Sequence, residues 1–85
     1  MTSTRKTSRS GSPSLSQMFG ANLQRARKKR RLSIDELARR CGYTPEYVQA
    51  VERGMDPELS LAEAETFAEA LGVHIADLMK RNVRF

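Results

Sequence analysis

Few side chains in this sequence could do covalent or acid–base chemistry, and their spacing does not bring them together. The chain has one Cys, Cys41, and one His, His74, so no nucleophile–base pair with an orienting group is indicated. His74 lacks a set of companions at metal-ligand spacing, and we expect it on the surface. Acidic pairs such as Glu63 and Glu65 fall on predicted helix surfaces. We therefore expect no enzyme, no metal and no cofactor.

The remaining chemistry is ionic. The 85 residues include 15 Lys and Arg against 10 Asp and Glu, a net charge of +5, and the isoelectric point is about 10.0. A basic chain favours a polyanionic partner, nucleic acid before membrane. One Cys excludes an internal disulfide, and no segment is typical of a membrane span or a signal peptide. We expect a cytoplasmic protein.

The elements that would position such contacts begin with two short helices in the middle of the chain. The first is predicted from Ser33 to about Arg40, because Ser33 and Glu36 have the spacing of a capping box. One apolar face is formed at helical spacing. It consists of Leu37, Ala38 and Cys41, where Cys41 is expected to be a small core side chain.

A second helix is predicted to start at Pro45, capped by Thr44, and to end at Gly54. Proline at the first helical position loses no hydrogen bond, and Gly42 between the helices permits a positive φ. Two short helices joined by a turn that contains Gly are typical of a helix-turn-helix, here over residues 33–54. The residues expected to face inward on the second helix are Val48 and Val51.

Three more helices are predicted around this motif, which gives an all-α fold of five helices. One starts at Ser14 or Ser16 and ends near Lys29, one lies within 60–72, and a short one covers Ile75–Met79. Apolar residues recur every three or four positions in the two longer helices, as expected for amphipathic helices. The predicted apolar stripes are Leu15, Met18, Phe19, Leu23 and Ala26 in the first, and Leu61, Ala64, Phe67, Ala68 and Leu71 in the second.

The two ends of the chain differ from the predicted helix-turn-helix domain at 15–80. Residues 1–14 are rich in Ser and Thr and cannot bury apolar surface, so we expect a flexible basic arm. The arm either has no role or follows DNA phosphates with its cations. These cations are Arg5, Lys6 and Arg9.

The tail, residues 81–85, is basic with two apolar side chains. Together with three apolar residues near the last predicted helix, these exceed what a five-helix domain can cover, which indicates a homodimer seam. The alternative is a tail whose Phe85 folds onto its own core. The residues expected in the seam are Val73, Ile75, Met79, Val83 and Phe85.

The order S-x-x-E-L-A-x-x-x-G-x-T-x-x-x-V-x-x-V-E-R-G over residues 33–54 resembles the phage repressor/Cro-type (XRE-like) helix-turn-helix family. The resemblance extends over residues 18–80. It includes Leu23–Arg27 upstream and Phe67–Val73 downstream. In the family, the arginine and glutamate that match Arg27 and Glu52 form a partly buried structural ion pair.

The resemblance also implies that the partner is double-stranded DNA and that the second helix of the motif enters its major groove. Base edges would face Pro45, Glu46, Gln49 and Ala50, with Tyr47 beside them. Phosphates would lie near Ser33, Ile34, Thr44, Arg53 and the loop Met55–Leu59.

Two departures from the family pattern bear on this interface. Ile34 stands where the family very often has Gln, whose amide reaches a phosphate, and the recognition helix has no Lys or Arg before Arg53. The basic charge lies elsewhere: residues 1–43 hold eleven Lys and Arg against two acidic residues, whereas residues 44–79 hold one Arg against eight. The cations are concentrated in the arm, at the end of the first helix and at Arg39 and Arg40.

Three functions therefore remain open from the sequence. The first is a dimeric DNA-binding transcriptional regulator. The second is a protein-interaction module of the antitoxin or adaptor type, which would use the acidic face of the third and fourth helices. The third is a DNA-binding protein of low specificity that relies on phosphates and DNA shape.

Overall fold

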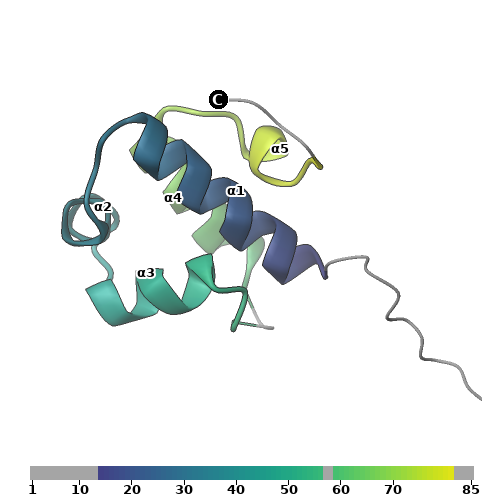
Figure 1. The fold of residues 1–85 in the computed structure, drawn as a ribbon, viewed down its shortest axis with the longest axis horizontal. Helices are drawn as coiled ribbons and strands as arrows, with labels where there is room; N and C mark the ends of the chain where they lie inside the picture. Colours follow the sequence, from purple (N-terminus) through teal and green to yellow (C-terminus); the bar gives the residue numbers. More distant parts are fainter. Residues whose placement is uncertain (1–13, 57–58, 82–85) are drawn as a thin grey trace, which may run out of the picture.

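Five helices form the part of the chain that the computed structural model describes, residues 14–56 and 59–81 (Figure 1). The all-α fold expected from the sequence is confirmed. The expected DNA contacts Arg5, Lys6 and Arg9 and the expected seam residues Val83 and Phe85 lie outside the described residues. The helices are α1 (Leu15–Lys29), α2 (Ile34–Cys41), α3 (Pro45–Glu52), α4 (Leu61–Leu71) and α5 (Ile75–Leu78).

Side-chain caps fix where the four longer helices begin. Ser14, and not Ser16, caps α1, and Thr44 caps α3 by accepting a hydrogen bond from the Tyr47 backbone N–H at 3.1 Å. The other starts are full capping boxes, in which a hydroxyl and a side chain three residues later each satisfy a backbone N–H. These pairs are Ser14 with Gln17, Ser33 with Glu36, and Ser60 with Glu63.

The end of α1 has an unusual residue. Arg31 has a φ of 58° and is the one described non-glycine residue with positive φ. Its N–H donates to the Lys28 carbonyl at 3.0 Å, and the Leu32 N–H donates to the Arg27 carbonyl at 3.1 Å. This is the Schellman pattern, whose left-handed position is usually glycine. The chain thereby turns sharply from α1 into α2.

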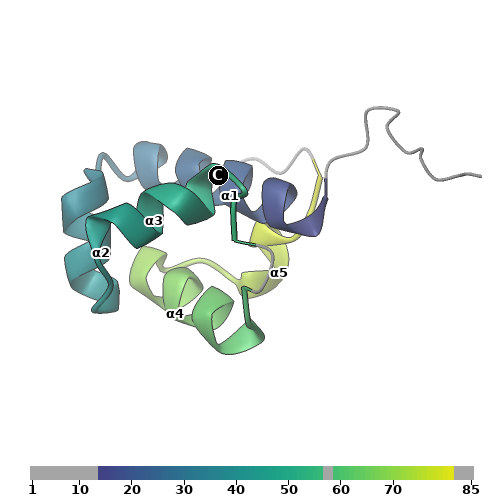
Figure 2. The same cartoon turned by 90° about the horizontal axis from the view of Figure 1, so that it is seen from below.

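α1 lies at the centre of the fold. In the view of Figure 2, α3 lies in front, between α1 and α4. In the same view α2 lies at one end of the molecule and α5 at the other. The rings of Phe19 and Phe67 meet in the core with centroids 6.0 Å apart. The buried apolar residues are Phe19, Leu23, Ala26, Leu37, Ala38, Val48, Val51, Ala64, Phe67, Ala68, Leu71 and Leu78.

Three members of the predicted apolar stripes are not in this core. Met18 is only half-buried. Leu15 is 61% exposed and Leu61 is 65% exposed. Leu15 and Leu61 each occupy the first position of their helix, where no described element covers them. Periodicity places a residue on a face, but it does not say whether the core extends to the helix end.

α1 and α3 approach each other closely at Gly20. The residue is buried, and a Cβ built on it would lie 2.3 Å from the Val51 carbonyl oxygen and 2.7 Å from that of Glu52. Such distances are far below van der Waals contact, so only glycine fits at this position without a shift of the backbone.

Candidate nucleic-acid interface

The outer face of α3 is open to solvent. Val48 and Val51 anchor the inner face in the core, which leaves the opposite side free. Ala50 is half-buried at the edge of this face. The expected contact residues that the structure leaves exposed are Pro45, Glu46, Gln49 and Arg53 on α3 or its end, and Ser33 and Thr44 at the helix starts.

Tyr47 does not lie on this outer face. Its ring is half-buried, stacked on Phe67 at a centroid distance of 6.3 Å and edge-to-face with Tyr43 at 5.0 Å. Its hydroxyl donates to a carboxylate oxygen of Asp56 at 3.1 Å. Burial, together with this hydrogen bond, raises the pKa of Tyr47 above its ordinary value of 10.0. The side chain thus connects α3 to α4 and to the following loop, which corrects the expected position beside the base edges.

The start of α2 is less polar than in a family member with glutamine there. Ile34 is half-buried and packs against the core. The Ser33 hydroxyl accepts a hydrogen bond from the Glu36 N–H at 3.0 Å, so one of its lone pairs is already used in the cap. The hydroxyl proton of Ser33 remains available for a phosphate oxygen.

Arg27 and Glu52 form the ion pair that the resemblance implies. Arg27 Nε and Nη2 donate to the two carboxylate oxygens of Glu52 at 2.6 and 3.1 Å, and Nη1 donates to the Leu32 carbonyl at 2.8 Å. Each residue is 8% exposed. This bidentate pair ties α1 to the end of α3 and to the turn before α2, and so fixes the orientation of the exposed face.

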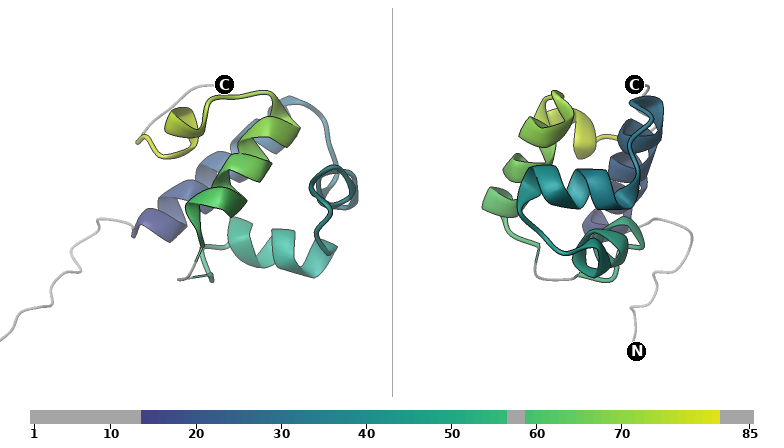
Figure 3. Two further views of the ribbon diagram at one scale, coloured as in Figure 1. Left: turned by 180° about the vertical axis from the view of Figure 1, so that it is seen from behind. Right: turned by 90° about the vertical axis from the view of Figure 1, so that its left-hand side faces the viewer.

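Cations flank α3 more than they occupy it. Arg53, directly after α3, is exposed, whereas Glu46 places a carboxylate in its first turn. A larger group of exposed cations lies at the end of α1 and on α2. The right-hand view of Figure 3 shows this side, with α2 across the front and α3 below it. The group consists of Lys28, Lys29, Arg30, Arg31, Arg39 and Arg40.

The residues singled out for other chemistry lie apart from this face. Cys41 is half-buried, and burial raises its pKa from 9.0 to about 11, so the thiol stays protonated at neutral pH. His74 is exposed at the start of α5 and forms no side-chain cap. No group of three metal-ligating side chains occurs within residues 14–56 and 59–81. The helices of the described part are all too short or too polar to cross a membrane.

Three of the five residues expected in the homodimer seam lie in the described part of the chain. Val73, Ile75 and Met79 are half-buried and pack against the core of their own chain. They therefore expose less apolar surface than their spacing suggested.

The fold and the sequence together define the class of protein. A family model described as "Helix-turn-helix" matches residues 23–78, which is more than half of the chain. The chain belongs to this family, and its type is the phage repressor/Cro (XRE) type. No curated protein matches the sequence.

Solved structures are similar to nearly the whole described chain. One is a hypothetical transcription factor, NHTF, from Neisseria, with 36% identity, a TM-score of 0.74, and coverage of 79% of this chain and 76% of that one. Another is the restriction-modification controller protein C.AhdI from Aeromonas hydrophila, with 33% identity, a TM-score of 0.70, and coverage of 74% and 94%.

The same scaffold also occurs as part of an enzyme. Hydroxypropylphosphonic acid epoxidase from S. wedmorenis is 32% identical with a TM-score of 0.75, over 81% of this chain but 36% of that chain. Similarity to this enzyme therefore concerns about a third of its length.

Proposed function

We propose that this protein is a sequence-specific DNA-binding transcriptional regulator that binds as a dimer and contacts bases in the major groove with α3. The observation that carries the proposal is the exposed outer face of α3, held rigidly by the Arg27–Glu52 pair on a helix-turn-helix scaffold. Similarity to a hypothetical transcription factor and to a controller protein supports it.

Gln49 is the residue best suited to recognise a base. It is exposed in the middle of α3. Its side-chain amide can form two hydrogen bonds with an adenine, one as donor and one as acceptor. Glu46 can accept from a cytosine amino group but otherwise repels phosphates. With few base contacts available, most of the affinity comes from phosphates.

The phosphate contacts come from cations beside the recognition helix. Arg53 lies at its end, and the basic group at the end of α1 immediately precedes Ser33, the start of α2. A duplex whose backbone passes the start of α2 would have this group within reach. The arm, with Arg5, Lys6 and Arg9, adds a further source of phosphate contacts.

The test is selection of bound duplexes from a random DNA pool, with the full chain and with a chain that lacks residues 1–14, at two salt concentrations. We expect one palindromic motif that survives removal of the arm. Gln49→Ala should relax the preference at one base step by about 1–3 kcal/mol, whereas Arg53→Ala should weaken binding to all sequences. Gln24→Ala, a change of the same type at an exposed position of α1, is the control.

Other outcomes would point to the alternative functions. Equal binding to scrambled and selected DNA would indicate a low-specificity architectural protein. Absence of an enriched motif, with binding lost at moderate salt, would indicate that the scaffold serves protein contacts. In that case the chain itself would be used to capture a protein partner. The acidic side of α3 and α4 would be the expected binding surface, as in an interaction module of the antitoxin or adaptor type.

A further inference from the structure

Asp56 lies in the loop directly after the recognition helix, where a carboxylate opposes binding to DNA. It follows the exposed Arg53 by three residues, and Met55 between them is 67% exposed. In the proposed function, Arg53 contacts a phosphate at this end of α3. A carboxylate beside it would repel that phosphate and compete for the guanidinium. Asp56 is nevertheless half-buried, so the direction of its side chain decides its effect on DNA.

Tyr47 binds the Asp56 carboxylate from the side of the core. Its hydroxyl donates to Asp56 Oδ2 at 3.1 Å, and its ring is fixed by contacts with Tyr43 and Phe67. Because burial raises the pKa of Tyr47, the hydroxyl keeps its proton at neutral pH and remains a donor. The hydrogen bond therefore directs the carboxylate inward, toward the aromatic cluster.

Glu63 is a second carboxylate near this hydroxyl, and it also raises the pKa of Tyr47. Its position is set by a different group. The Ser60 N–H donates to Glu63 Oε1 at 3.0 Å in the capping box of α4. Asp56 is therefore the carboxylate that the Tyr47 proton orients.

The backbone of the loop is fixed to α1 by contacts that do not involve Tyr47. Ser16 Oγ donates to the Asp56 carbonyl at 3.0 Å. Gly54 has a φ of 71° and lies against α1, where a Cβ built on it would be 2.8 Å from the Gln17 Cα. The backbone between Gly54 and Asp56 should therefore stay in place when the Tyr47 hydroxyl is removed. The expected change is a rotation of the Asp56 side chain.

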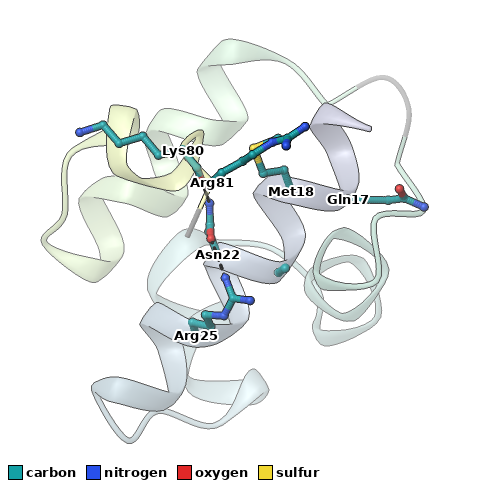
Figure 4. A pocket seen from close by; sticks show the side chains of 7 residues that line it. Gln17, Met18, Asn22, Arg25, Lys80 and Arg81 are labelled. Carbon is teal, nitrogen blue, oxygen red and sulfur yellow. Dashed lines mark hydrogen bonds between the residues drawn. The ribbon is translucent and has the colours of Figure 1, made fainter. Parts of the chain in front are cut away.

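α1 also holds the segment after α5 through a buried side chain. Asn22, 1% exposed, donates from Nδ2 to the carbonyls of Leu78 at 3.0 Å and Lys80 at 2.6 Å, a contact that we call the Asn22 clamp (Figure 4). The cations beside it, Arg25, Lys80 and Arg81, point apart in this view and do not converge on a common anion site. We therefore base no phosphate site on this side of α1.

We propose that Tyr47 is a positioning residue for DNA binding, whose hydroxyl keeps the Asp56 carboxylate turned away from the phosphates that Arg53 contacts. The proposal deepens the proposed function and rests on it, because it concerns the same end of α3. Without the hydroxyl, the carboxylate can rotate toward Arg53 and the DNA backbone. Binding is then weakened by a charge that the fold otherwise directs inward.

Fluorescence anisotropy of the full chain on the selected duplex and on a scrambled duplex, over a salt series, tests this role. Tyr47→Phe removes the hydroxyl and keeps the ring. It should weaken binding to both duplexes by the same factor, about threefold or more at low salt, because repulsion of phosphates does not depend on sequence. The loss should shrink as salt is raised, since salt screens the repulsion.

Tyr43→Phe is the matched control, because it makes the same change in the same aromatic cluster. The Tyr43 hydroxyl forms no hydrogen bond with another residue in the described part of the chain. This variant should bind both duplexes as the wild type does. Circular dichroism of each variant at the assay temperature separates a lost contact from a lost fold.

Neutralising Asp56 distinguishes a role in positioning from a role in folding alone. Asp56→Asn keeps an acceptor for the Tyr47 hydroxyl but removes the charge, and it should bind at least as tightly as the wild type. Adding Tyr47→Phe to Asp56→Asn should then cause no further loss. If the hydroxyl acted only through the fold, Tyr47→Phe would cause the same loss in both backgrounds.

Three results would overturn the proposal: a Tyr47→Phe variant that binds as tightly as the wild type, a double variant that is as weak as Tyr47→Phe, or a change of sequence preference in place of a uniform loss. A wild-type chain that binds neither duplex would overturn the proposed function as well. Sequence-specific binding by the wild type, without coupling between Tyr47 and Asp56, would overturn this proposal alone.

Discussion

Gly20 determines how closely α1 can approach α3. Helix propensity alone favours alanine over glycine in the middle of a helix by about 1 kcal/mol. The backbone oxygens of Val51 and Glu52 occupy the place of the missing side chain. The tertiary contact and the intrinsic propensity therefore predict opposite signs for the same substitution.

We expect Gly20→Ala to destabilise the fold by about 2 kcal/mol, because the added methyl must push the end of α3 away. Urea unfolding followed by circular dichroism measures the change. If the variant had the same or a higher free energy of unfolding than the wild type, α1 and α3 would have to move apart without loss of stability. Ala21→Gly, at the next and half-buried position, is the control and should show only the propensity effect.

Individual side chains differed in how far the sequence could predict their positions. The Arg27–Glu52 pair could be assigned by resemblance because both positions lie within the stretch that resembles the family, residues 18–80. The positions of Asn22 and Tyr47 could not be predicted in this way. The partners of Asn22 are two carbonyls at and after the end of α5, far along the chain, and the partner of Tyr47 is a carboxylate in a loop. A polar residue on a predicted helix gives no sign of a buried partner that lies 56 or 58 residues away.

At the scale of elements, the end of α1 has backbone strain at Arg31 that its sequence does not predict. An L-residue in the left-handed region costs about 1–2 kcal/mol relative to glycine, and Arg31 adopts that region. Four consecutive cations mark the end of the helix without indicating which of them takes the positive φ. The hydrogen bonds around the turn hold Arg31 there.

Arg31→Gly should raise the free energy of unfolding by about 1 kcal/mol, because glycine adopts the left-handed conformation without strain. Arg31→Ala removes the same charge but keeps the Cβ, and it should give no such gain. Urea titrations of the two variants and the wild type provide the comparison. Equal stabilities of the glycine and alanine variants would show that the strain is absent in solution.

Helix starts were the elements best predicted from the sequence. Ser33 and Ser60, each followed by Glu three residues later, begin α2 and α4 as expected. Local hydrogen bonds determine a cap, so neighbouring residues are sufficient to predict it. The exposure of Leu15 and Leu61 was not predictable, because it depends on where other elements stop.

The capping boxes also give the fold an acid-sensitive component. The backbone N–H of Ser33 holds the pKa of Glu36 below its ordinary value of 4.5, and that of Ser60 does the same for Glu63. A carboxylate whose pKa is lowered in the folded state contributes stability above pH 4.5, which is lost as the pH falls through the lowered value. We therefore expect the melting temperature to fall as the pH is lowered below 4.5. Glu36→Gln and Glu63→Gln should flatten the fall, whereas Glu69→Gln, an exposed residue outside the caps, should not.

Across the whole molecule, charge is divided between two regions. The cations of α1 and α2 and the carboxylates of α3 and α4 lie on different elements, with Arg53 as the cation at the end of the recognition helix. Composition alone gave the net charge of +5 but not where it lies in space. The fold brings the end of α1 beside α2, and so concentrates positive charge on one side.

Binding to DNA should therefore depend steeply on salt, mostly through residues outside α3. Replacing Lys29 and Arg30 together by alanine should reduce the slope of log affinity against log salt concentration by up to about 2. Fluorescence anisotropy on one selected duplex over a salt series measures the slope. Replacing Lys80 and Arg81 instead is the comparison, and a larger effect there would indicate that the DNA lies against the segment after α5.

The Asn22 clamp has a consequence for how the molecule opens. α5 has four residues, too few to persist as an isolated helix, and it depends on Leu78 in the core and on the two carbonyls that Asn22 binds. Its backbone amides should exchange with deuterium sooner than those of α1, through a local opening that leaves the other helices intact. An exchange rate in α5 as slow as that in α1 would show instead that this helix opens only when the whole fold opens.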